Sequence, residues 1–108
     1  MALLLKIIDA QAIANFDSAS QRLIQDYGFA LQCNVAGADA DPLITIECSN
    51  DSVVWFDLDG LSTDVPVVAA GIMLEKNIFL QQYIRVKVEA NGATTGTITA
   101  QLFLRTDN

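Results

Sequence analysis

The side chains best suited to chemistry in this sequence are carboxylates, because its 108 residues include 13 acidic residues and no histidine. Without histidine, the commonest general base and the Ser-His and Cys-His nucleophile pairs are missing. Asp57, Asp59 and Asp64 group oxygen ligands that suit a hard cation such as calcium, but no glutamate closes an EF-hand loop. All three fall in turn-like segments, where aspartate is common because its side chain bonds nearby backbone amides. The sequence therefore favours turn formation over a calcium site or a glycosidase-like acid pair, and it predicts no catalytic residue, cofactor or metal.

Cys33 and Cys48 are the only thiols in the sequence. Two cysteines without histidine are too few for a zinc site or for a scaffold held by several disulfides. Both lie at apolar positions of strand-like segments. Buried free thiols are therefore favoured over a disulfide between them.

Charge and composition limit the partners of the chain. Six basic residues against 13 acidic ones give a formal net charge of -7, which repels phosphate and argues against nucleic acid or an anionic membrane as a partner. Hydrophobic residues make up 52%, more than one small core needs, so we expect a homo-oligomer that buries part of this surface.

The apolar run of residues 3–8 lacks a preceding basic region and is too short to cross a bilayer. We therefore expect no targeting or membrane segment, and assembly in the host cytoplasm.

Alternation of apolar and polar residues predicts strands over most of the chain after residue 28. The pattern is clearest over residues 29–35, 44–48, 83–89 and 97–105, where a period of two turns one side of each strand toward a core. Turn residues separate these segments at short intervals. The sequence predicts a single all-β domain, either an antiparallel β-sandwich of jelly-roll or immunoglobulin-like type or a small barrel, with an extended N-terminal arm.

The same pattern predicts local pairing. Residues 29–35 and 44–48 are expected to form a hairpin with both cysteines facing the core. Residues 53–56 are expected to form a short apolar strand in which Trp55, the single tryptophan, anchors the core.

The first 25 residues differ in kind from the sandwich domain expected over residues 26–108. An apolar segment outside its own sheet is a candidate arm that adds a strand to the edge of a neighbour. The alternative is that it forms the first strand of the sandwich itself.

Four segments of the sequence, taken in order, resemble a known group of proteins. They are residues 28–37, residues 44–51 followed by Trp55, residues 83–86 and residues 96–99. In this order the chain resembles a group of small tailed-phage virion proteins, which are β-sandwiches that serve as capsid decoration (cement) proteins or other structural components. The most specific part is the Ser-Asn-Asp turn before Trp55, where Ser52 stands in place of the usual glycine.

The resemblance implies a bacteriophage decoration protein that binds the major capsid protein on the outer capsid surface, commonly as a homotrimer, and stabilises the shell. Its contacts would be apolar and spread over area. The residues expected to dock on the capsid or add a strand are Leu3, Leu4, Leu5, Ile7 and Ile8. Those expected between copies are Val65, Val67, Val68, Ile72 and Met73, with a core strand and loop over residues 65–73 as the alternative.

Two other functions are weighed against decoration. A tail, baseplate or fibre component could act as a carbohydrate-binding or adaptor module, although sugar sites need exposed aromatic residues and the supply here is short. A metal-dependent hydrolase would have to use the aspartates already assigned to turns, and it is disfavoured for that reason.

Overall fold

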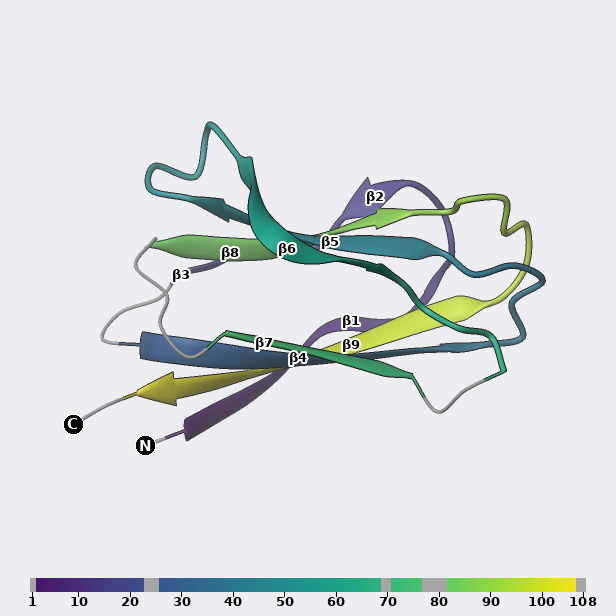
Figure 1. Cartoon of the computed structure of the whole chain (residues 1–108), viewed down its shortest axis with the longest axis horizontal. Coiled ribbons are helices and arrows are strands. Elements are labelled where there is room, and N and C mark those ends of the chain that lie inside the picture. The colour runs from purple at the N-terminus through teal and green to yellow at the C-terminus, as the bar shows by residue number, and fades with distance from the viewer. Residues whose placement is uncertain (1, 23–25, 69–70, 77–81, 107–108) are drawn as a thin grey trace.

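The computed structural model of this chain describes residues 2–22, 26–68, 71–76 and 82–106. These residues form two antiparallel sheets that pack face to face (Figure 1). Sheet A has the strand order β1-β9-β4-β7, and sheet B has the order β2-β8-β5-β6, with β3 also paired to β8. The predicted antiparallel β-sandwich is confirmed. The strands are β1 (Ala2–Ala12), β2 (Phe16–Asp17), β3 (Gln21–Arg22), β4 (Asp26–Ala36), β5 (Leu43–Ser49), β6 (Phe56–Asp64), β7 (Ile72–Lys76), β8 (Tyr83–Glu89) and β9 (Thr97–Thr106).

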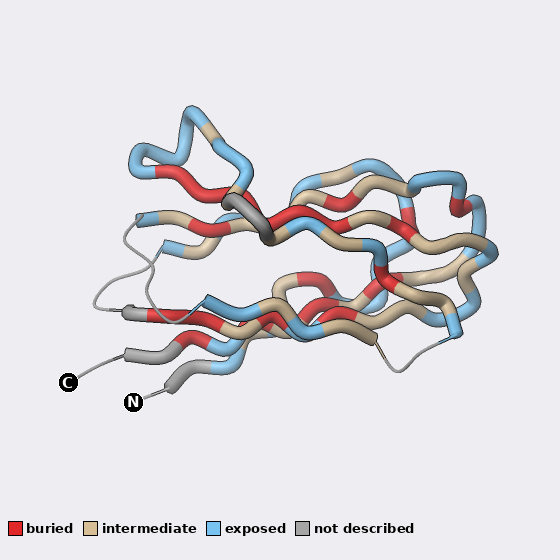
Figure 2. Tube along the Cα trace, viewed as in Figure 1, coloured by how far each residue is buried: buried red, intermediate tan, exposed pale blue. Residues whose placement is uncertain are grey.

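The core lies between the two sheets, where alternate residues of each strand meet. In β8, Ile84, Val86 and Val88 are each 1% exposed, as the alternation predicts. Figure 2 shows that strands of both sheets contain buried residues. Removing one such side chain from water contributes roughly 1.5–3 kcal/mol, so this double row holds the sheets together. Other fully buried core residues are Leu31, Cys33, Ile44, Ile46, Ile98, Leu102 and Leu104.

The N-terminal residues form the first strand of the sandwich, not an arm. Strand β1 pairs with β9 from Ala2 opposite Arg105 to Ala12 opposite Thr97, with two irregularities in between. Ile8 is buried in the shared core. Because β1 finds its partner within its own chain, the first-strand alternative describes this structure and the extended arm does not.

The predicted hairpin between residues 29–35 and 44–48 is also wrong. Strand β4 pairs with β7 and β9 in sheet A, whereas β5 pairs with β6 and β8 in sheet B. The intervening loop therefore crosses from one sheet to the other. Period-two alternation reports which side of a strand is buried, not which strand lies beside it.

Both cysteines are free and buried, one in each sheet. Cys33 is fully enclosed in β4, and burial raises the pKa of its thiol to about 12. Burial also raises the pKa of Cys48 in β5, with smaller contributions from the charges of Glu47 and Asp57. The preference for buried free thiols is confirmed.

The predicted strand at residues 53–56 is replaced by a loop. Strand β6 begins only at Phe56, and Val53 and Val54 are exposed. Their backbone N–H groups are hydrogen-bonded to the side chain of Asp51, so they cannot pair with a neighbouring strand.

No helix able to span a membrane occurs among the residues that the structure describes.

Candidate protein interaction surfaces

The outer face of sheet A carries an uncharged surface, here named the sheet A patch. It consists of Leu4 from β1, Gln101 and Phe103 from β9, Ala30 and Gln32 from β4, and Met73 from β7. Leu4 lies opposite Phe103, which lies opposite Ala30. In the next row, Gln101 lies opposite Gln32, which lies opposite Met73. Residues paired in this way project from the same face of a sheet, so the register itself brings the six together.

The sheet A patch is more apolar than an ordinary solvent face. Leu4 is 61% exposed, Met73 is 56% exposed and Phe103 is 41% exposed. They surround a shallow hollow of about 290 Å³. The outer face of an antiparallel sheet usually presents polar residues to water, and a contiguous apolar area there marks a site of protein contact.

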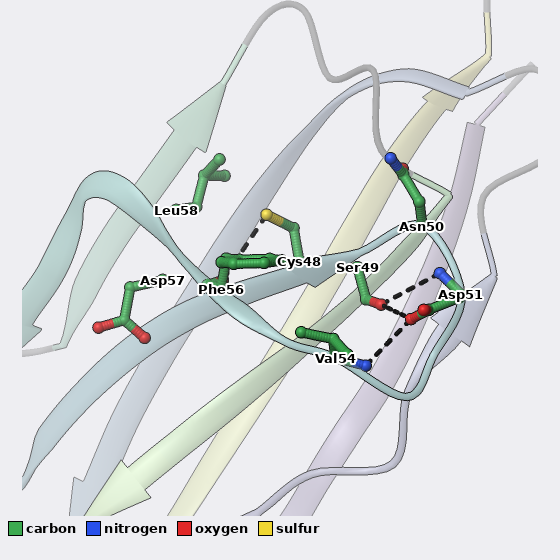
Figure 3. A pocket seen from close by; sticks show the side chains of 8 residues that line it. All are labelled: Cys48, Ser49, Asn50, Asp51, Val54, Phe56, Asp57 and Leu58. Atoms are coloured by element: carbon green, nitrogen blue, oxygen red, sulfur yellow. Dashed lines mark hydrogen bonds between the residues drawn. The ribbon is translucent and has the colours of Figure 1, made fainter.

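The loop between β5 and β6 is held in one shape by Asp51 (Figure 3). Its Oδ1 accepts hydrogen bonds from the N–H groups of Val53 and Val54 at 2.9 and 3.0 Å, and from the Ser49 hydroxyl at 3.0 Å. These bonds, that from Val54 first, lower the pKa of Asp51. Ser52 has a φ of 61°, in the left-handed region that favours glycine.

This ordered loop presents Val53, Val54 and Phe56, here named the loop tip, to solvent. Each is more than half exposed, and Val53 is exposed most, at 78%. Beside them lies an open hollow of about 360 Å³, into which Figure 3 shows the side chain of Cys48 pointing. A loop already fixed in shape loses little conformational entropy on binding, so its apolar side chains are suited to docking.

A cluster of charged side chains packs against Trp55, which lies in this loop. The Arg85 guanidinium carbon lies 4.1 Å from the centroid of the Trp55 ring. Its Nε donates to Oε1 of Glu47 at 2.8 Å, and its terminal nitrogen lies 3.5 Å from Oδ2 of Asp17. Glu47 is only 7% exposed, so water reaches little of this ion pair. Trp55 therefore covers the outer side of sheet B and does not anchor the core, contrary to the prediction.

The three aspartates weighed as a calcium site lie along β6, so the prediction that they form turns is wrong. Asp57 and Asp64 are exposed, and Asp64 accepts a bond from the Asn91 amide at 3.4 Å. The side chain of Asp59 lies outside the described residues. Within the parts of the chain that the structure describes, no group of three or more histidine, cysteine, aspartate or glutamate residues could hold a metal ion.

The residues predicted to dock on the capsid or add a strand differ in exposure according to the face of β1 on which they lie. Leu4 is exposed, as a contact residue must be, whereas Leu5 and Ile7 are half-buried and Ile8 is buried. The side chain of Leu3 is outside the described residues. Leu5, Ile7 and Ile8 pack on the core, so at least part of each side chain is not available to a partner.

The residues predicted to lie between copies also differ in exposure. Val65 is fully buried and Ile72 is half-buried, and both pack in the core, but Val65 and half-buried Val67 lie between β6 and β7 and do not form the core strand weighed as the alternative. Val68 and Met73 are exposed. The structure thus brings Leu4 and Met73 from the two predicted groups onto one face, with two central strands between them.

Sequence reasoning missed Phe103 and the loop tip. Phe103 stands between Leu102 and Leu104, which are both buried, so the period of two in β9 already turned it outward. The loop tip had no comparable signal, since Val53, Val54 and Phe56 resemble a buried strand until the bonds of Asp51 are known.

A second aspartate ties two loops together and should affect acid stability. Asp39 accepts bonds from the hydroxyl and N–H of Thr94 and from the N–H of Thr95, which lower its pKa from 3.8 to about 2. The unfolded chain therefore binds a proton at Asp39 more readily than the folded chain does. The stabilisation is fully present above about pH 4 and is lost as the pH falls through 2.

We expect Asp39→Asn to show a shallower loss of stability than the unchanged protein between pH 4 and 2, measured by urea unfolding. The matched control is Asp57→Asn, which removes the same charge at another exposed aspartate and so separates the effect of net charge from that of the Asp39 hydrogen bonds. Identical acid profiles for Asp39→Asn and the unchanged protein would contradict the assignment.

Comparison with known proteins adds information about the fold. No family model and no curated protein matches the chain. Among solved structures, the crystal structure of the SPBc2 prophage-derived protein YomS is similar, with a TM-score of 0.76 and 12% sequence identity. The match covers 96% of this chain and 92% of that one. At this identity the likeness shows a shared fold alone.

Proposed function

We propose that this chain is a structural protein of a phage particle, and that it binds the outer surface of the capsid as a decoration protein. The observation that carries the proposal is the loop tip, where a loop fixed by Asp51 exposes Val53, Val54 and Phe56. The fold shared with a prophage-derived protein and the resemblance to virion proteins support the phage setting.

The physical properties of the loop tip fit a protein partner. Tight protein contacts centre on a few large apolar side chains that enter a pocket on the partner and exclude water. Holding them on an ordered loop lowers the entropy cost of docking. The net charge of -7 disfavours phosphate-rich partners, so the tip is better suited to a capsid protein than to nucleic acid or lipid.

The first test is the copy number of the chain in purified particles, measured by quantitative mass spectrometry against the major capsid protein. Decoration requires hundreds of copies. A handful would place the chain in the tail or at a vertex, and its absence would overturn the virion role.

The second test is binding of the purified chain to capsids that lack it, measured by cosedimentation. We expect Val53→Ser combined with Phe56→Ala to weaken binding at least about tenfold, since truncating a central contact residue costs more than 1 kcal/mol. The matched control is Val68→Ser, because Val68 is 94% exposed but lies away from the loop. Equal binding by both variants would contradict docking through the tip.

The carbohydrate-binding alternative has less support. A sugar platform needs an open aromatic face, and one face of Trp55 is covered by Arg85. Tyr83, an aromatic residue at the end of β8, is half-buried.

A further inference from the structure

The strand register aligns the residues on the outer face of sheet A across the sheet. Two rows of residues cross all four strands in the order β1, β9, β4 and β7. Each row begins on one edge strand and ends on the other. The first row is Leu4, Phe103, Ala30 and Glu75, and the second is Lys6, Gln101, Gln32 and Met73.

We propose that this face binds the same face of a second copy of the chain, about a twofold axis that runs parallel to the strands between β9 and β4. Such an axis places β9 of one copy over β4 of the other and β1 over β7. The contact is isologous, so each pairing occurs twice. This inference does not depend on what the loop tip binds.

The central pairings fit in shape and in hydrogen bonding. The axis places the large side chain of Phe103 over the small side chain of Ala30 in the second copy. It places Gln101 over Gln32, and an amide both donates and accepts, so two glutamines can bond to each other. Exposed Leu4 and Met73 lie at the margins, where the axis places Leu4 over Glu75 and Met73 over Lys6 of the second copy, against the aliphatic parts of those charged side chains.

The charges favour a second copy over a different acidic or basic partner. Among the eight residues of the two rows, Lys6 and Glu75 alone are charged, and they lie at opposite edges. The twofold brings Lys6 of each copy diagonally near Glu75 of the other. In the single chain, Lys6 lies 3.7 Å from Asp9, but both are exposed and such a pair contributes little, so Lys6 is free to reorient.

The test is sedimentation velocity of the full chain over a range of concentrations. Eight residues a side make a small interface, so we expect a reversible dimer with a dissociation constant on the order of 10 μM. A monomer at millimolar concentration would overturn the proposal. A cyclic trimer, as expected from the resemblance, would also overturn it, because an isologous contact closes at two copies.

Two matched variants locate the contact. Phe103→Glu should yield a monomer, since it sets carboxylates in the centre of the interface. Phe56→Glu makes the same change at another exposed phenylalanine and should leave the dimer intact. Circular dichroism checks that both fold. Dimerisation of Phe103→Glu equal to that of the unchanged protein would exclude this face.

A charge exchange tests the axis independently of Phe103. Lys6→Glu alone and Glu75→Lys alone should each weaken the dimer a few fold, and the double variant should recover most of the loss. Failure of the double variant to recover would overturn the twofold arrangement. Failure of the dimer proposal can be distinguished from failure of the proposed function, because Phe56→Glu should lose capsid binding without losing the dimer.

Discussion

Replacing Gly96 with alanine is expected to lower the free energy of unfolding by on the order of 3 kcal/mol, from a strained φ and a clash of comparable size. Gly96 has a φ of 100°, which alanine rarely adopts. An added Cβ would lie 2.6 Å from the nitrogen of Ala38 and 2.8 Å from the carbonyl oxygen of Ala36. Both are backbone atoms, so the loop between β4 and β5 would have to move.

The Gly96→Ala substitution should also weaken the hydrogen bonds between segments that meet at this end of the sandwich. The carbonyl of Gly96 accepts the N–H of Ile13 at 3.1 Å, and the neighbouring Thr95 hydroxyl donates to the carbonyl of Gly37 at 2.9 Å. Three segments distant in sequence therefore meet at Gly96. Displacing one of them strains these bonds together.

Gly92→Ala is the matched control for Gly96→Ala. Gly92 has a similar φ of 91°, but an added Cβ would meet nothing within 4 Å. We expect this variant to lose only about 1–2 kcal/mol, the cost of the backbone conformation. Urea unfolding of both variants gives the difference. Equal losses would show that the close approach at Gly96 does not matter.

Replacing Arg85 with methionine is expected to cost about 2–3 kcal/mol, because it leaves the buried carboxylate of Glu47 without its charged partner. The substitution also removes the guanidinium on which Trp55 is stacked. Glu47 is 7% exposed, so water can replace little of what is lost. The loss should appear in urea unfolding, and Trp55 fluorescence should shift as the ring becomes freer.

Two further variants separate charge from packing. Lys87→Met changes the next outward position of β8, where Lys87 is 3.5 Å from Glu89 and both side chains are over 40% exposed. It should cost less than about 0.5 kcal/mol. Adding Glu47→Met to Arg85→Met should recover part of the loss, since an apolar pair leaves no unpaired charge. No recovery would attribute the loss to packing alone.

The candidate surfaces were only partly predictable from the sequence. The apolar excess indicated contact surface, and Leu4 and Met73 were both named in advance. Their joint position on one face depends on β1 and β7 lying at opposite edges of sheet A, with β9 and β4 between them. The loop tip depends on bonds made by a single side chain, Asp51, which turn an apolar strand-like segment into an exposed loop.

By itself the sequence determined that the chain is all-β and which strand faces are buried, and it favoured free thiols inside over a disulfide, whereas the choice between a sandwich and a small barrel was left open. These properties follow from a period of two that each segment carries locally, as Ile84, Val86 and Val88 show. Only the tertiary structure decided which strands pair, because a pairing such as β1 with β9 joins opposite ends of the chain, and every strand offers the same backbone donors and acceptors. The surfaces offered to partners are set by that choice, since register places side chains from distant strands side by side.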